Sequence, residues 1–345
     1  MPSQQRTFES RIDYSLLLPV LLLLSIGVTA IYIAVSHDYP NNVLQIVGQQ
    51  VVWILLGFLI SFIVMFFNTK FLWKMTPFLY ILGLGLMVLP LVFYSESLVA
   101  STGAKNWVSI RGVTLFQPSE FMKISYILML SRVVVKFLQQ NKNYERTIAL
   151  DLFLIVKLAL YTLPVLLLLA LQSDLGTALV FAAIYCGIVL LSGVSWKIIL
   201  PVFLTVSLLF TVFMLIFISN GGRAFLHGLG MPTYQINRIS AWLHPFEYAQ
   251  TVTYQQAQGQ IAIGSGGLLG QGFNVSNLLV PVRESDMIFT VIAEDFGFLG
   301  SSLVIVIYLF LIHRMLQITI KSNNQFYTYI STGLIMMLLF HIFEN

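Results

Sequence analysis

The chain has 345 residues, of which 58% are apolar and only 9% are charged, and its mean hydropathy is +0.87. Soluble globular proteins carry about 25% charged residues, so this composition excludes a water-soluble enzyme and equally a disordered chain. The single cysteine, Cys186, lies inside an apolar run, which excludes a disulfide framework and a cysteine-based metal site. We therefore predict an all-α protein that crosses a membrane several times.

The apolar runs have the length of membrane-spanning helices. A helix needs about 20 mostly apolar residues to cross the hydrocarbon core of a bilayer. The first run is too long for the apolar part of a signal peptide and leads directly into a second, so we predict that it remains as the first span. Nine candidate spans cover approximately residues Ser15–Val35, Gln45–Phe67, Pro77–Tyr94, Ser119–Leu138, Leu150–Leu171, Leu175–Leu191, Lys197–Ser219, Met287–Ile312 and Phe326–Phe343.

Lys and Arg residues indicate the orientation of these spans. With the N-terminus inside, eleven of the 18 basic residues fall in inner connections, five in outer connections and two, Lys123 and Lys157, at membrane depth. Inner connections are enriched in Lys and Arg, so we predict an inner N-terminus. The net charge of +4 then reflects topology, and no nucleic-acid partner is predicted. The five outer residues are Lys105, Arg111, Arg223, Arg238 and Arg283.

Two of the predicted outer connections are long. The first covers roughly residues 95–118, and the second covers residues 220–285, between the seventh and eighth spans. The second contains several aromatic residues and an apolar stretch at 261–263, which is unusual for a flexible loop. We expect this large extracellular loop to be partly helical, with short amphipathic helices at Tyr234–Leu243 and Tyr248–Ile261.

Charged side chains at membrane depth are candidates for function because they are costly to keep there. Glu120 and Lys123 are three residues apart on one helical face, where they can form an ion pair that is either structural or part of a cavity lining. Asp174 precedes the sixth span, where a helix cap is the simpler interpretation of the residue viewed alone. Glu294 and Asp295 lie inside the eighth span, and because adjacent residues cannot share a face, at least one should point into the bundle.

Asp286 lies immediately before the eighth span, at the predicted outer membrane boundary. It could be a helix cap, which the spacing alone favours, or a partly desolvated carboxylate that acts as a general base. The nearby glycine-rich stretch 264–272 lacks the Gly-Lys-Ser/Thr ending of a phosphate-binding loop, so tight turns or close helix contacts explain it better than a nucleotide site. His227 and His244 do not have zinc-ligand spacing, and no metal site is predicted.

Read together, six segments resemble the SEDS family of shape, elongation, division and sporulation proteins, and most closely its RodA branch. The likeness spans nearly the whole chain, and the changes within the segments keep the acidic residues. The family pattern has about ten spans and a late Gly/Pro/Ser-rich segment, so we expect this chain, which stops at Asn345, to lack the last part of that pattern. The segments are Gly103–Trp107, Gln117–Lys123, Gln172–Ala178, Ala262–Gly267, Ser285–Phe289 and Ala293–Gly300.

The resemblance implies an enzyme that polymerises lipid II into β-1,4 glycan strands of peptidoglycan, with inversion and release of undecaprenyl pyrophosphate, in cell elongation and shape control. Asp286 would be the general base, and outer cations would offset charge on the departing pyrophosphate, a role that a divalent cation (Mg²⁺ or Mn²⁺) could share. Trp107 would pack against substrate or help close the site. The cation candidates are Lys105, Arg223, Arg238 and Arg283, and Glu120, Lys123 and Asp174 would line the cavity.

The resemblance also implies a location and partners. A single membrane domain of residues 1–345 would sit in the bacterial cytoplasmic membrane with its active site facing outside. It would work with a class B penicillin-binding protein, which crosslinks the strands, and with other membrane proteins of the elongation complex. Two alternatives stay open: a lipid II flippase, because a multispan protein with intramembrane charges suits translocation, and a non-catalytic scaffold for the crosslinking enzyme.

Overall fold

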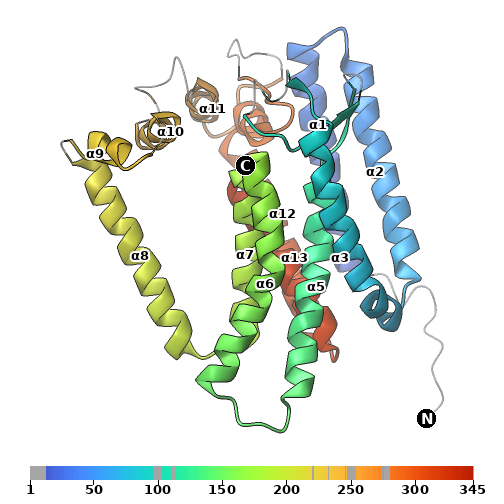
Figure 1. Ribbon diagram of the computed structural model, residues 1–345. Coiled ribbons are helices and arrows are strands. Elements are labelled where there is room, and N and C mark those ends of the chain that lie inside the picture. Colours follow the sequence, from blue (N-terminus) through green and yellow to red (C-terminus); the bar gives the residue numbers. More distant parts are fainter. Residues whose placement is uncertain are drawn as a thin grey trace. The chain divides into compact units, whose positions relative to one another are not determined.

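Helices make up most of the computed structural model of the chain (Figure 1). It describes residues 13–96, 99, 103–110, 113–219, 221–231, 233–244, 246, 254–273, 275 and 280–344, apart from the side chains of Ile110, Val113, Tyr234 and Arg238. The helices are α1 (Tyr14–Asp38), α2 (Val43–Met65), α3 (Thr69–Val92), α5 (Pro118–Gln140), α6 (Ile148–Gln172), α7 (Leu175–Leu191), α8 (Trp196–Ile218), α9 (Gly222–Gly228), α10 (Thr233–Leu243), α11 (Tyr254–Ser265), α12 (Ile288–Lys321) and α13 (Gln325–Glu344). The two strands are β1 (Val108–Ile110) and β2 (Val113–Phe116).

A helix lies at each of the nine apolar runs. Seven helices of the described chain are long and apolar enough to cross a membrane, namely α1, α2, α3, α6, α8, α12 and α13. Helix α7 is shorter, with 17 residues, and α5 is less apolar because it carries several charged residues. The protein is therefore a multi-pass helical membrane protein, with seven candidate spans among the residues that the structure describes.

Several helices begin where a polar side chain caps them. Asp13, Asn68 and Asp174 each accept a hydrogen bond from a backbone amide in the first turn of α1, α3 and α7, at N–O distances of 3.0, 2.8 and 3.1 Å. Helix α5 begins with Pro118 at its first position, where a backbone amide would have no hydrogen-bond partner within the helix, so proline is tolerated there. Helices α1, α5 and α7 begin within one residue of the predicted starts. The predicted start at Pro77 is wrong for α3, which begins eight residues earlier at Thr69, because the first turns of α3 carry Lys70 and Lys74 and do not read as part of an apolar run.

The chain forms two compact units. Unit 1 comprises residues 1–64, 204–314 and 345, and unit 2 comprises residues 65–203 and 315–344. Helices α2, α8 and α12 pass from one unit to the other along the chain. The two units are described separately below.

In unit 2, helices α3, α5, α6, α7 and α13 pack around one apolar core. Helix α5 is its most enclosed element, and the ring of its Tyr126 meets Phe181 of α7 edge to face at 5.1 Å. Close packing depends on small residues, because a Cβ at Gly83 of α3 would lie 2.6 Å from the Met122 sulfur of α5. Strands β1 and β2 form an antiparallel hairpin with a bulge between Val108 and Ser109, in the connection before α5.

In unit 1, α1 packs against the first part of α12 through a cluster that includes Ala34, Val291 and Ile292. A second cluster joins the end of α8 to α9 and α10 through Phe217, Leu226 and Ile236. Helices α9, α10 and α11 all lie within residues 220–285, and α10 and α11 coincide largely with the two short helices expected there. Residues 248–253 of the second expected helix lie outside the described residues.

Candidate functional site

The nine residues predicted for the site divide between the two units. Asp286, Arg223, Arg238 and Arg283 belong to unit 1, and Lys105, Trp107, Glu120, Lys123 and Asp174 belong to unit 2. Within each unit the structure brings some of them into contact with neighbours that the sequence did not single out.

Asp286 lies in a run of turns, residues 281–287, that leads into α12 at Ile288. Its side chain is exposed. Hydrogen bonds from the amides of Ser285 and Ile288 to carbonyls three residues earlier keep the backbone of this segment tightly turned. A carboxylate on such a turn is accessible to a polar substrate, which a general base requires.

Arg283, three residues before Asp286, is buried, with only 4% of its surface exposed. Its Nε and Nη2 atoms donate to the two carboxylate oxygens of Asp38, at the end of α1, at 2.7 and 3.1 Å. Its Nη1 atom lies 3.6 Å from Oε2 of Glu294 in α12. The guanidinium is therefore occupied by carboxylates, which differs from the predicted role of a cation presented to a pyrophosphate.

The end of α1 is linked to the same turn through further polar groups. His37 Nδ1 lies 2.8 Å from Oδ1 of Asp38. The carboxylate of Glu284 raises the pKa of the Tyr39 hydroxyl, and partial burial adds to this shift. Negative charge on Glu284 thus lies close to Tyr39, just beyond the end of α1.

Helix α12 is broken at Gly297, whose φ of 66° and ψ of −160° are not helical. A segment of residues 266–272, here called the glycine clasp, satisfies the backbone groups that the break leaves unpaired. A Cβ at Gly266 would lie 2.0 Å from the Ala293 carbonyl oxygen, so only glycine permits this approach. Before the break, the carbonyls of α12 accept backbone amides of the clasp: Gln271 donates to Glu294 at 2.9 Å and Gly272 to Asp295 at 3.2 Å. After the break, amides of α12 donate to carbonyls of the clasp: Phe298 to Gly267 at 2.9 Å and Leu299 to Leu268 at 3.2 Å.

The glycine clasp confirms the expectation that close helix contacts explain the glycine-rich stretch. Glu294 and Asp295 lie just before the break and are both buried, at 2% and 8% exposure. The prediction that at least one of them points inward is confirmed. Their backbone carbonyls accept the amides of Gln271 and Gly272 in the clasp.

The two remaining predicted cations of unit 1 lie on short helices. Arg223 of α9 is exposed, and its guanidinium lies 5.3 Å from the ring centre of Phe217. Arg238 belongs to the backbone of α10, but its side chain lies outside the described residues. Two of the predicted cations of unit 1, Arg223 and Arg283, have described side chains. Of these two, Arg223 is exposed and Arg283 is buried.

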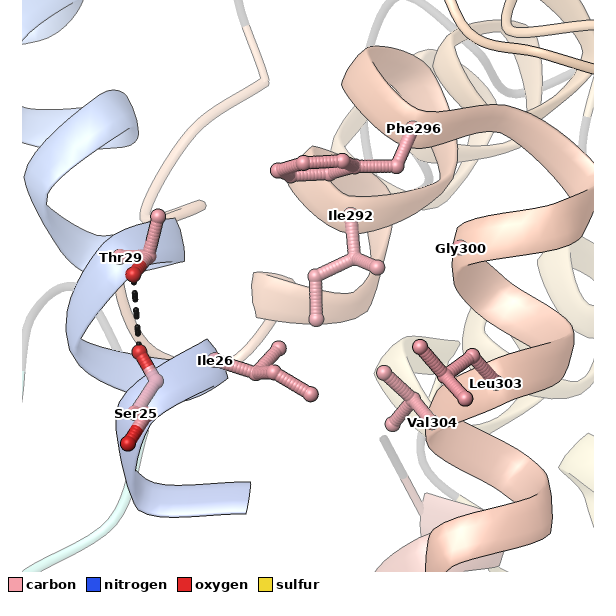
Figure 2. A pocket seen from close by; sticks show the side chains of 8 residues that line it. All are labelled: Ser25, Ile26, Thr29, Ile292, Phe296, Gly300, Leu303 and Val304. Carbon is pink, nitrogen blue, oxygen red and sulfur yellow. Dashed lines mark hydrogen bonds between the residues drawn. The ribbon is translucent and has the colours of Figure 1, made fainter. Parts of the chain in front are cut away.

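An apolar groove of about 300 Å³ lies between α1 and α12 in unit 1 (Figure 2). The hydroxyls of Ser25 and Thr29 in its wall donate to carbonyls one turn earlier, so they do not offer free polarity to the groove. No ionisable side chain contributes to this lining, which suits hydrocarbon better than sugar. The lining residues are Ser25, Ile26, Thr29, Ile292, Phe296, Gly300, Leu303 and Val304.

In unit 2, the predicted ion pair of α5 is present. Lys123 Nζ lies 2.8 Å from Oε1 of Glu120, and Lys123 is buried whereas the Glu120 side chain is 58% exposed. The ammonium also lies 3.0 Å from Nε2 of His341 in α13. A buried lysine thus connects an exposed carboxylate with an imidazole from the far end of the chain.

Asp174 is buried at the start of α7 and combines two roles. Its Oδ1 accepts from the amide of Thr177, which confirms the helix cap. Its Oδ2 accepts from the side-chain amides of Asn106 at 2.8 Å and Gln117 at 3.5 Å. The Thr177 hydroxyl also donates to Oδ2, at 2.9 Å. The carboxylate therefore joins the connection between α3 and α5, the start of α5 and the start of α7 in one polar cluster.

Lys105 and Trp107 flank Asn106 in the connection before β1. The backbone amide of Lys105 donates to the carbonyl of Gln172 at 2.8 Å, and its ammonium lies 4.4 Å from the ring centre of Tyr94. The Trp107 side chain is 40% exposed. Both side chains are partly accessible, as a substrate-contacting role requires.

The sequence did not single out three polar residues of these clusters as candidates for the site. Asp38 lies three residues after the first apolar run, and an acid there is a signal that could have been used. His341 lies in the last run, where a lone histidine is not informative, and Asn106 is an ordinary loop residue. Their partners are 245, 218 and 68 residues away in the chain, so no local spacing reveals them.

The described side chains were compared with the ligand sets of protein-bound metal ions. Within the part of the chain that the structure describes, no three His, Cys, Asp or Glu side chains lie close enough together to hold a metal ion. Mg²⁺ and Mn²⁺ are held largely by carboxylate oxygens. The described residues therefore do not form a protein-only metal site, and no chemical step is assigned to a metal.

Comparisons with known proteins agree with this architecture. The family model FTSW_RODA_SPOVE, described as a cell cycle protein, matches residues 14–345. The peptidoglycan glycosyltransferase MrdB of Escherichia coli K12 is 29% identical over 347 residues, covering 99% of this chain and 85% of MrdB.

Two solved structures share the fold. A chain of the structure titled "Structural coordination of polymerization and crosslinking by a peptidoglycan synthase complex" matches with a TM-score of 0.71 at 24% identity, over 94% of this chain and 83% of that chain. The rod shape determining protein RodA of Thermus thermophilus matches with a TM-score of 0.61 at 24% identity, over 96% and 83%. Because the family model covers nearly the whole chain, this protein belongs to the FtsW/RodA/SpoVE family of cell cycle proteins.

Proposed function

We propose that this protein is a peptidoglycan glycosyltransferase, which polymerises lipid II into β-1,4 glycan strands. The observation that carries this proposal is Asp286, an exposed carboxylate on a tightly turned segment just before α12, in a chain whose relative MrdB is named for that activity. Family membership supports the reaction class, and the accessible acid supports the assignment of the base.

The reaction needs one base and an activated donor. Asp286 accepts the proton of the acceptor's 4-hydroxyl as its oxygen attacks the anomeric carbon of the donor sugar. The bond from that carbon to the pyrophosphate oxygen breaks, and undecaprenyl pyrophosphate leaves with the bonding electrons. Attack opposite the leaving group converts the α-linked donor into a β-linked product. No nucleotide is required, because the donor already carries its leaving group.

Cations stabilise the charge that develops on the departing pyrophosphate. Arg223 and Lys105 are partly or fully exposed and suit this role, and Arg238 remains a candidate from the sequence. Arg283 does not suit it, because two carboxylates occupy its guanidinium. Trp107 offers an exposed indole face against which a sugar can pack.

The same proposal includes the topology. Nine spans, with the N-terminus inside, place residues 220–285 and Asp286 outside the bacterial cytoplasmic membrane, within one membrane domain of residues 1–345. Lipid II reaches the protein within the bilayer, and the apolar groove beside α12 suits part of its hydrocarbon tail. A class B penicillin-binding protein is the proposed partner, which would crosslink the new strands.

A lipid II flippase is the second candidate. The buried Lys123, between Glu120 and His341 at membrane depth, favours it, because transport pathways are lined by such intramembrane charges. A flippase moves lipid II between leaflets and makes no glycosidic bond.

Purified protein in detergent micelles, incubated with lipid II, distinguishes these functions. A polymerase makes glycan strands there, whereas a flippase or a scaffold makes none. Asp286→Asn removes the base with little change in size, and we expect it to lower the rate at least about 100-fold. The matched control is Glu145→Gln, the same kind of change on an exposed acid in the connection between α5 and α6. Wild-type rates from Asp286→Asn would remove this residue from the mechanism.

A further inference from the structure

We propose that Arg283 is a positioning residue, whose buried ion pairs with Asp38 and Glu294 hold the turn that carries Asp286 in its working geometry. The inference rests on the proposed function, because it assigns Asp286 as the base. It differs from the role expected from the sequence, in which Arg283 would contact the pyrophosphate itself.

The geometry of the Arg283–Asp38 pair is that of a fixed connection. Two parallel hydrogen bonds, at 2.7 and 3.1 Å, join the guanidinium fork to both oxygens of one carboxylate. Such bidentate pairs define orientation as well as distance. The Arg283 and Asp38 side chains are only 4% and 12% exposed, so water does not weaken the pair as it does at a surface.

The contact between Arg283 and Glu294 closes the chain segment that contains Asp286. Nη1 of Arg283 lies 3.6 Å from Oε2 of Glu294, which comes eleven residues later on the first part of α12. Glu294 is itself fixed, because its carbonyl accepts the amide of Gln271 in the glycine clasp. Asp286 thus lies on a loop whose two ends are joined by an ion pair.

The backbone beside Arg283 needs such support. Val282 has a φ of 56°, in the left-handed region that a β-branched residue rarely adopts. Strained residues persist only where the surrounding structure holds them. On the other side of Val282, the side chain of Gln255 in α11 donates to the Pro281 carbonyl at 3.1 Å. Arg283 and Gln255 therefore hold the strained residue from both sides.

The test compares Arg283→Lys with Arg314→Lys in the full chain. Lysine keeps the positive charge but loses the planar fork. Arg314 is the matched control, because it forms a similar fork with Asp13 at the other end of α1, at 2.7 and 3.3 Å. Misplacing a catalytic group by about 1 Å costs about 100-fold in rate. We expect Arg283→Lys to lower kcat about 10- to 100-fold with KM within about twofold, and Arg314→Lys to change neither.

A second readout does not depend on catalysis. Hydrogen exchange of the amides in residues 282–291 reports how firmly the turn and the start of α12 are held. We expect Arg283→Lys to speed this exchange about tenfold and Arg314→Lys to leave it unchanged. The double variant Asp38→Asn/Arg283→Lys should lose little more kcat than Arg283→Lys alone, because both changes break one connection.

Several outcomes would overturn the inference. An increase in KM with unchanged kcat would mean that Arg283 binds the substrate directly. Equal kcat and equal exchange in Arg283→Lys and wild type would mean that the pair is dispensable. If the wild-type chain makes no glycan, the proposed function fails, and unchanged hydrogen exchange in Arg283→Lys would then refute the structural part by itself.

Discussion

Replacing Asp174 with serine and with alanine separates two contributions of this side chain to stability. Oδ1 caps α7 by accepting the Thr177 amide, and Oδ2 accepts the side-chain amide of Asn106. Serine can replace the cap acceptor but is too short to reach Asn106, whereas alanine removes both acceptors. We therefore expect stability to decrease from wild type to the serine variant and again to the alanine variant.

The size of each decrease follows from the geometry. A helix cap contributes about 1 kcal/mol. The Asn106 bond, 2.8 Å long, reaches a buried charged acceptor, and bonds of this kind contribute about 1.5–3 kcal/mol. The Thr177 hydroxyl also donates to Oδ2, at 2.9 Å, and this bond contributes about 1 kcal/mol. The Gln117 contact is 3.5 Å long and adds little. The serine variant should lose about 3 kcal/mol and the alanine variant about 4 kcal/mol of unfolding free energy.

Thermal unfolding of the full chain in detergent, followed by tryptophan fluorescence, measures these losses. Trp107 lies next to Asn106 in the sequence and is partly exposed, so its emission reports on this region. For a unit of this size, the expected decreases in Tm are about 6–12 °C for serine and about 8–16 °C for alanine. Equal Tm values for the two variants would refute the cap contribution. An alanine variant as stable as wild type would refute the whole account of Asp174.

Three further predictions concern unit 1. Gly266→Ala forces a Cβ against a backbone oxygen of α12 and should destabilise the protein by about 1–3 kcal/mol. Gly264→Ala, on α11, places its Cβ in open space and should not destabilise it. Chemical unfolding measures the free energy of unfolding of both variants. A hydrogen bond from Arg314 lowers the pKa of Asp13 below its usual 3.8, so this stabilisation is present above about pH 4 and is lost as the pH falls through the lower folded-state pKa. The Tm of wild type should therefore fall more steeply with acid than that of Asp13→Asn, and parallel curves would contradict this assignment. Leu303→Trp fills the apolar groove and should raise KM for long-tailed lipid II about tenfold, with a smaller change for a short-tailed analogue.

Much of the fold was readable from the sequence because it depends on local patterns. Runs of apolar residues predict helices, since a helix satisfies its own backbone hydrogen bonds inside a membrane. The span predicted at Leu175–Leu191 has the same bounds as helix α7, and Asp174 caps that helix as expected. The pairing of Glu120 with Lys123 was also predictable, because residues three apart share a helical face.

The partners of the buried charges were decided only by the tertiary structure. Asp38 and Arg283 are 245 residues apart, and Lys123 and His341 are 218 residues apart, so no helical period links them. The break of α12 at Gly297 was likewise hidden within a run predicted as one span, because a glycine there has the same hydropathy whether the helix continues or stops. The sequence shows which charged residues lie in apolar surroundings and therefore need a partner. Which group becomes that partner depends on how distant helices pack, since ion pairs form only between atoms a few ångströms apart.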